Sequence, residues 1–230
     1  MGDAVKLSQA DPASPVSFKA LPHFPRLRVL LTNTNVPRRT SALVGRVKTL
    51  YEAPSTAEVT RRIFEGITAA CEQFLALVSS SSEVGPVSMN TIGQLIRMNH
   101  GLLSALQVSA PALERVCELA DSEGLPTKLT GAGGGGCAFS LIGSSSEGEA
   151  AAQRVQAKLE AEGFTCYVTT VGGHGALWHS ANAIPIQTNA PAPPSSPLAH
   201  VITQKKRVLA LTAAATAAAV ASALWIVRRK

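Results

Sequence analysis

Lys128-Leu-Thr-Gly-Ala-Gly-Gly-Gly-Gly-Cys-Ala-Phe-Ser-Leu141 is the stretch that decides the fold. Five glycines and one alanine follow a β-like start and lead into an apolar segment that is typical of a strand. Glycine reaches positive φ without the penalty of a Cβ atom, and it lets a phosphate or another backbone approach closely. Consecutive N–H groups in such a turn can form a concave anion site. Because strand-forming residues stand on both sides, a specific tight turn is favoured over a flexible linker.

The glycine run matches neither of the two common nucleotide loops. It lacks the Gly-Lys-Ser/Thr ending of a Walker loop, and no β-α-β unit opens on it, as a G-x-G-x-x-G fingerprint requires. The substrate- or phosphate-proximal candidates are the members of the run: Thr130, Gly131, Ala132, Gly133, Gly134, Gly135 and Gly136. We expect them where an added side chain would displace a ligand; the alternative is a strand connection without ligand contact. Thr130 either binds substrate or caps the loop, and Lys128 either neutralises phosphate or is solvated.

The glycine run resembles the third signature motif of the GHMP small-molecule kinases, in the version found in mevalonate kinases. Two further blocks support the resemblance and occur in the family order. Leu-Leu-Thr-Asn-Thr-Asn-Val-Pro-Arg-Arg-Thr at residues 30–40 resembles the segment that follows the catalytic half of these kinases. Met-Asn-His-Gly-Leu-Leu-Ser-Ala-Leu at residues 98–106 resembles the helix before the glycine run. The resemblance extends over roughly residues 20–182.

The resemblance implies transfer of the γ-phosphoryl group of ATP to the 5-hydroxyl of mevalonate, with Mg²⁺ as the metal. The phosphate loop P-x-x-G-L-G-S-S-A and the catalytic aspartate of the family belong to an N-terminal half, which no stretch of this chain resembles. We therefore expect a C-terminal half that holds no catalytic residue and no metal ligand and is inactive alone. Mevalonate and ATP are the implied partners, and a homodimer stays open. The alternatives are another GHMP kinase, such as phosphomevalonate kinase, or a tail-anchored, non-enzymatic metabolite-binding scaffold.

The block at residues 30–40 supplies the other candidate site residues. Arg38, Arg39 and Thr40 follow a predicted strand, and ligand contacts often come from loops at such places. The resemblance implies that these three residues face the mevalonate or phosphate side, and Arg38 and Thr40 are the site candidates. Arginine suits this role because its guanidinium binds carboxylate or phosphate in a bidentate manner. The alternative is a pair of solvated arginines.

The periodicity of apolar residues predicts helices between strands without a regular β-α-β repeat. This pattern indicates an α+β fold with an antiparallel sheet, as in the GHMP kinase C-terminal domain. His100 lies on one of the helices and is predicted to be a surface or capping residue. Thr40 or Ser41 is predicted to cap the first helix. The predicted strands are 27–33, 137–142, 164–171 and 176–180, and the helices are 40–51, 57–78, 88–106, 110–122 and 147–162.

Four regions follow from composition. Residues 1–25 are predicted to be irregular, 26–182 to form the kinase-like domain, and 183–204 to be a Pro-rich linker. Residues 205–230 hold twenty uncharged residues, from Val208 to Val227, between two groups of basic residues. A helix of that length spans about 30 Å, the thickness of a bilayer core. We expect a tail anchor on the cytosolic face of an organelle membrane; the alternatives are an Ala-rich soluble helix or an unstructured tail in the cytoplasm.

The charge distribution argues against nucleic-acid binding. The net charge of +6 equals the six basic residues of the tail, so the rest of the chain is formally neutral. No basic stripe remains for a phosphate backbone. The four cysteines are far apart in the sequence and are expected to be reduced, mostly buried thiols rather than disulfides or a zinc site.

Overall fold

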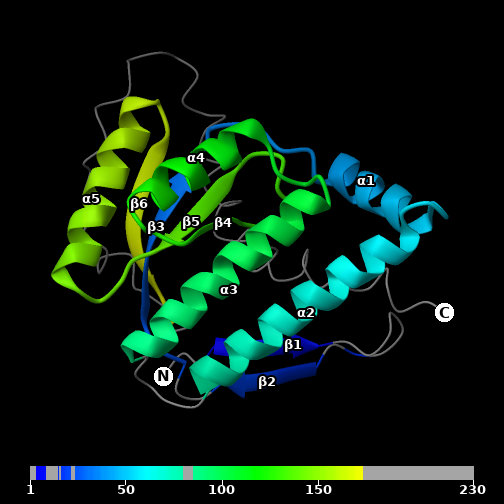
Figure 1. The fold of residues 1–230 in the computed structure, drawn as a ribbon, viewed down its shortest axis with the longest axis horizontal. Helices are drawn as coiled ribbons and strands as arrows, with labels where there is room; N and C mark the ends of the chain where they lie inside the picture. Colours follow the sequence, from blue (N-terminus) through cyan, green and yellow to red (C-terminus); the bar gives the residue numbers. More distant parts are fainter. Residues whose placement is uncertain (1–3, 9–14, 16, 22–23, 80–84, 173–230) are drawn as a thin grey trace, which may run out of the picture.

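The structure is a computed structural model and describes residues 4–8, 15, 17–21, 24–79 and 85–172. Two long helices, α2 and α3, run side by side, and α4 and α5 lie on the other side of a sheet (Figure 1). The elements are β1 (Ala4–Ser8), β2 (Ser17–Leu21), β3 (Leu27–Asn33), α1 (Thr40–Glu52), α2 (Ala57–Ser79), α3 (Pro86–Ala105), α4 (Pro111–Ser122), β4 (Thr127–Leu129), β5 (Cys137–Leu141), α5 (Ser146–Ala161) and β6 (Thr165–Val171).

The main sheet has four strands in the order β4-β5-β3-β6, and every neighbouring pair is antiparallel. This confirms the predicted α+β class with an antiparallel sheet. Asn33 pairs with Cys137 on one side and with Thr165 on the other, so β3 occupies the centre of the sheet. The glycine run connects β4 to β5 and therefore emerges at the same end of the sheet as the segment that follows β3.

The prediction that residues 1–25 are irregular is wrong for two segments. β1 and β2 pair antiparallel, with Ala4 opposite Leu21 and Ser8 opposite Ser17. Each strand alternates short apolar and polar positions, and Pro12 and Pro15 lie between the strands rather than inside them. The proline and serine content of the whole region concealed this alternation.

Alternation along β3 places its side chains in two cores, one on each face of the sheet. Leu30 belongs to a core that joins one face of the sheet to α4 and α5. Val29 faces the opposite side and belongs to a second core with α2 and α3. The helix side chains buried against Leu30 include Leu113, Val116, Ala152, Val155 and Leu159, and those in the core of Val29 are Val78, Ile92 and Ile96.

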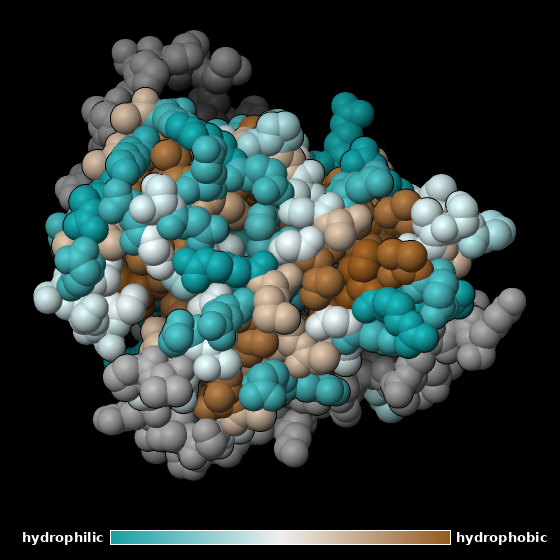
Figure 2. Space-filling view, viewed as in Figure 1, coloured by the Kyte–Doolittle hydropathy of each residue, from teal (hydrophilic) through white to brown (hydrophobic). Residues whose placement is uncertain are grey.

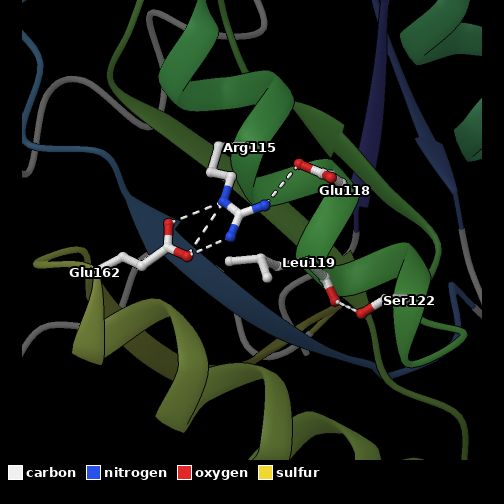
Figure 3. Close-up of polar contacts among 5 residues, drawn as sticks. All are labelled: Arg115, Glu118, Leu119, Ser122 and Glu162. Atoms are coloured by element: carbon white, nitrogen blue, oxygen red, sulfur yellow. Dashed lines mark hydrogen bonds and ion pairs between the residues drawn. The ribbon is translucent and has the colours of Figure 1, made fainter.

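Ion pairs hold α4 against α5 at the surface. Arg115 on α4 donates to both oxygens of Glu162, directly after α5, from Nε at 3.2 and 3.0 Å and from Nη2 to Oε1 at 2.6 Å (Figure 3). Its Nη1 donates to Glu118 one turn along α4, and at the end of that helix Ser122 Oγ donates to the Leu119 carbonyl. The Arg115 guanidinium lowers the pKa of the Glu162 carboxyl below its usual value.

The structure also tests the predictions for the cap of the first helix and for the cysteines. The first helix begins at Thr40, but its N-cap is Arg39 without a side-chain hydrogen bond, so the predicted Thr40 or Ser41 cap is wrong. All four cysteines are free; Cys117 and Cys166 are buried, whereas Cys71 is exposed. The predicted strand 176–180, the linker and the tail lie outside the described residues. In the part that the structure describes, no helix has the length and apolar character needed to cross a membrane.

Candidate functional site: the glycine loop and its two supports

The glycine loop, residues 130–136, has a backbone that few other residues could adopt. Gly131, Gly133, Gly134, Gly135 and Gly136 all have positive φ, between 67° and 137°. An L-residue in the left-handed region brings its Cβ atom too close to the following carbonyl, whereas glycine has no Cβ. The sequence prediction of a specific turn therefore agrees with the backbone.

The first support of the loop is the connection between β3 and α1. The backbone N–H and the hydroxyl of Thr34 both donate to the Gly136 carbonyl, each at 2.8 Å. In return, the Gly136 N–H donates to the Val36 carbonyl at 3.0 Å. Asn35, between them, has φ 58° and its side chain reaches the Gly163 carbonyl and the Thr165 hydroxyl, both at 3.1 Å. These contacts join the strand end, the loop and the α5–β6 turn.

The second support is the connection between α3 and α4. The Gly134 N–H donates to the Val108 carbonyl at 2.7 Å. The preceding residue, Gln107, has φ 59°, and its carbonyl accepts a hydrogen bond from Arg46 Nη1 of α1 at 2.9 Å. Sequence analysis did not assign Val108 or Gln107 to the site, because neither residue type carries a signal for such a role.

The space beside the glycines is filled by the protein itself. A Cβ atom on Gly133 would lie 1.9 Å from the Val108 carbonyl oxygen, and one on Gly135 would lie 2.6 Å from the Val36 carbonyl oxygen. On Gly134 it would meet Leu43 Cδ1 of α1 at 2.7 Å. At these positions an added side chain would collide with other parts of the chain itself. We had expected it to displace a bound ligand instead.

Arg38 lies directly against the loop. Its Nη1 atom would be 3.3 Å from a Cβ atom on Gly136. Burial raises the pKa of the adjacent Cys137 thiol, and the Arg38 guanidinium acts in the opposite direction. Arg38, Arg39 and Thr40 are all exposed. The structure thus brings predicted site residues from two distant segments together and leaves a guanidinium at the solvent side of the loop.

The two remaining polar candidates on β4 and the loop have different surroundings. Thr130 Oγ1 donates to the Cys137 carbonyl at 2.9 Å, and the Thr130 N–H donates to the same oxygen at 2.9 Å. Thr130 therefore closes the loop, as one of its two readings predicted. Lys128 places Nζ 5.8 Å from the centroid of the Phe139 ring, and burial lowers the pKa of its ammonium group. Lys128 is half-buried, which lies between full solvation and a buried ammonium group.

His100 was predicted to be a surface or capping residue, and this prediction is wrong. It is 9% exposed, and the backbone N–H of Leu129, one residue before the loop, donates to its Nδ1 atom at 3.4 Å. Its Nε2 atom lies 3.5 Å from Glu114 Oε2 on α4. Because Nδ1 accepts a hydrogen bond, the ring proton belongs on Nε2, facing the carboxylate. His100 therefore supports the start of the loop from α3.

Phosphate and magnesium fit the described residues differently. The exposed Arg38 guanidinium beside Gly136 suits a phosphate oxygen, whereas the N–H groups of Gly134 and Gly136 already donate to the Val108 and Val36 carbonyls. Among the described residues, no group of three or more His, Cys, Asp or Glu side chains converges to hold a metal ion. This part of the chain fits a phosphate, and it offers no side-chain set for Mg²⁺.

Comparison with known proteins identifies the class. The family described as GHMP kinases C terminal matches residues 88–162, which include α4, β4, the glycine loop and β5. The crystal structure of L. major mevalonate kinase in complex with R-mevalonate has a TM-score of 0.62 at 23% identity, covering 76% of this chain and 51% of that one. Streptococcus pneumoniae phosphomevalonate kinase has a TM-score of 0.53 at 16% identity, covering 68% and 44%. The described fold is that of a GHMP kinase C-terminal domain.

Sequence similarity relates the chain to curated mevalonate kinases. The chain is 39% identical over 181 residues to the mevalonate kinase of Aspergillus fumigatus, covering 77% of this chain and 33% of that protein. It is 36% identical over 168 residues to the human mevalonate kinase, covering 73% and 42%. This protein is a mevalonate kinase homologue of the GHMP kinase family. It spans about a third to two-fifths of the length of these curated relatives.

Proposed function

We propose that this chain acts as the C-terminal part of a mevalonate kinase, in which ATP phosphorylates mevalonate at the 5-hydroxyl. The observation that carries the proposal is the contact between Arg38 and the glycine loop in a chain that is 39% identical to a mevalonate kinase. Phosphoryl transfer depends mainly on positioning and on stabilising charge. The Arg38 guanidinium, which lies beside the glycine loop, supplies charge and bidentate geometry for a carboxylate or a phosphate.

The proposal assigns a limited role to the described residues. Arg38 binds an anionic group of mevalonate or of the nucleotide, and its guanidinium lies beside Gly136 of the glycine loop. Mg²⁺, when bound with ATP, neutralises phosphate charge; the described residues hold no ligand set for it. The family's phosphate loop and catalytic aspartate have no counterpart in the chain, so we expect no turnover from this chain alone.

The test is a chimaera that joins the N-terminal half of the Aspergillus fumigatus enzyme to residues 24–230 of this chain. We expect ATP-dependent, mevalonate-dependent ADP release from the chimaera and none from the chain alone. Arg38→Ala should lower kcat/KM by about 10–100-fold, the effect of losing one charged hydrogen bond. Arg39→Ala is the matched control, an exposed neighbour for which we expect less than about a threefold change. Equal losses from both variants would contradict the role of Arg38, and turnover by the chain alone would contradict the division of roles.

We also propose that residues 208–227 anchor the protein to the cytosolic face of an organelle membrane. Support comes from the length of the uncharged segment and from the basic residues on both of its sides. A fusion of residues 183–230 to a fluorescent protein should resist extraction with alkaline carbonate. Leu211→Asp with Val220→Asp should release it, because a charge at the helix centre costs about 2.5–3.5 kcal/mol on insertion scales. A fusion that is extracted by carbonate without these substitutions would contradict the proposal.

A further inference from the structure

An apolar groove lies between α2 and α3, away from the glycine loop. Its volume is about 640 Å³, and its lining includes Gly66, Ala69 and Ala70 of α2 and Gly101 of α3. Gly66, Ala69 and Ala70 lower the α2 wall over about one turn, and Gly101 lowers the α3 wall at one position. Gln73 is its single polar lining residue. Hydrophobic residues gather on the face where α2 and α3 lie (Figure 2).

The rim of the groove exposes large apolar side chains. Met98 is 61% exposed at the edge formed by α3. Val59 is 64% exposed on α2, seven residues before Gly66 and therefore on the same helical stripe. The exposed Arg62 lies between Val59 and Gly66 on this face, so the apolar lining of the groove itself begins at Gly66. Single exposed apolar residues are ordinary, but a groove with an apolar rim indicates a binding surface.

The concave shape of the groove favours a single helix over a second copy of the protein as its binding partner. A second copy related by a two-fold axis would place groove against groove, and two concave surfaces leave a void where close packing is needed. A convex rod fills the groove instead. A helix with small side chains can enter it most closely, because helix axes approach to about 8 Å only where the contacting residues are small.

Such a rod is available in this chain. Nine of the twenty residues in 208–227 are alanine and none is charged. In water, a helix of this composition has no polar face and requires a covering surface. The 35 residues 173–207 separate it from the end of β6, and an extended chain of that length reaches up to about 110 Å. This reach exceeds the roughly 30 Å length of α3, so the tether does not prevent docking.

We propose that the α2–α3 groove binds the C-terminal segment 208–227 of the same chain as a helix when no membrane is present. The groove covers part of the apolar segment in water, and a bilayer competes for it. Docking and membrane insertion are then mutually exclusive states of one segment. The proposal adds an intramolecular site to the proposed function and does not depend on kinase activity.

Photo-crosslinking of the full chain in detergent-free buffer tests the docking. Met98→p-benzoylphenylalanine places the probe in the groove, and Tyr167→p-benzoylphenylalanine on β6 is a control at an exposed aromatic position. Trypsin cleaves after Arg207 and Arg228, so the segment is released as one peptide. We expect this peptide to crosslink to position 98 within one chain, with at least about a fivefold lower yield from position 167. Crosslinks between two chains, equal yields, no crosslink to the segment, or a chain that is soluble only in detergent would each overturn the proposal.

A pair of matched substitutions shows whether the groove itself is responsible. Gly101 and Gly45 are both helical glycines whose Cβ position meets nothing within 4 Å. Gly101→Leu fills the groove and should lower the crosslink from position 98 at least fivefold, whereas Gly45→Leu on α1 should leave it unchanged. Leu211→Asp with Val220→Asp, which alters only the tail, should abolish the crosslink even if Gly101→Leu fails to fold. Persistence of the crosslink in the tail variant, or an equal loss in both leucine variants, would overturn the proposal.

Discussion

The glycine loop and the α2–α3 groove are both rich in glycine, yet glycine has opposite meanings in them. In the loop, Gly133 has φ 78° and the space beside its Cα atom is filled by the Val108 carbonyl. In the groove, Gly101 belongs to a regular helix, and the space beside it is open. The first kind of glycine is required by the backbone, and the second leaves room for something outside the described residues. The same substitution, glycine to alanine, should therefore have opposite effects in the two regions.

The largest effect is expected for Gly133→Ala. Its Cβ atom would overlap the Val108 carbonyl oxygen at 1.9 Å, and the left-handed backbone adds about 1–2 kcal/mol of strain. The α3–α4 connection would have to move, so we expect a loss of at least about 3 kcal/mol in the free energy of unfolding. Urea unfolding of the full chain, followed by circular dichroism, measures it. An unchanged midpoint would show that the second support of the loop is not formed.

Gly134→Ala should have a smaller effect that depends on one neighbour. Its Cβ atom would meet the end of the Leu43 side chain at 2.7 Å, and a side chain can move more easily than a backbone carbonyl. We expect a loss of about 1–2 kcal/mol, part of which is backbone strain at φ 71°. In a Leu43→Ala background the loss should shrink by about 0.5–1 kcal/mol, since the clash is removed and the strain remains. Purely additive effects would contradict the contact between α1 and the loop.

The outcome for the fold shows what sequence patterns encode. Apolar periodicity predicted the described helices and three of the four strands of the main sheet, because each of these elements buries one face; β4 has three residues, too few to show a repeat. The β1–β2 hairpin was missed because the prolines and serines of residues 1–25 indicated an irregular segment. The first helix lacks a side-chain cap although Thr40 and Ser41 are good capping residues. The capping preference of threonine and serine therefore did not determine which residue stands at the N-cap of α1.

The site was predictable only in part, for a different reason. The glycine run and Arg38 carry chemistry that is visible in one segment, and the resemblance to a known family placed them together. The residues that hold them, Val108 and Leu43, act through a backbone carbonyl and through packing, which any apolar residue supplies. His100 was assigned to the surface because nothing in its own helix shows that β4 and α4 enclose it. Contacts between distant segments carry no signal in either segment alone.

Replacing helical glycines by alanine is expected to raise the free energy of unfolding rather than lower it. Gly45→Ala should raise the free energy of unfolding by about 0.5–1 kcal/mol, because alanine restricts the unfolded chain and meets no atom within 4 Å in the folded one. Gly101→Ala should give the same gain in a chain that carries Leu211→Asp and Val220→Asp. In the unsubstituted chain its gain should be smaller, since the added methyl group competes with the docked segment. Equal gains in both backgrounds would count against docking, and a loss at Gly45 would contradict the open space beside it.

The smallest effect on stability is expected at the ion pairs between α4 and α5. Unlike the contacts of the glycine loop, these pairs stabilise the fold through charge. The pKa of the Glu162 carboxyl is lowered by its hydrogen bonds with Arg115, so the folded state holds its proton less tightly than the unfolded state does. A lowered carboxyl pKa stabilises the fold above the unfolded value of about 4.3, and this contribution disappears as the pH falls through the lower folded value. Comparing the urea midpoint of Glu162→Gln with that of the unsubstituted chain should therefore give a small difference at pH 7 that begins to shrink at about pH 4.3 and vanishes once the pH lies below the lowered folded pKa. High salt should also reduce the difference, because the pair is exposed.

Gly134→Ala is the control, since its effect arises from backbone strain and packing and should be the same at both pH values. A Glu162→Gln difference that persisted in acid would mean that the Glu162 side chain holds α4 and α5 together through packing rather than through its charge.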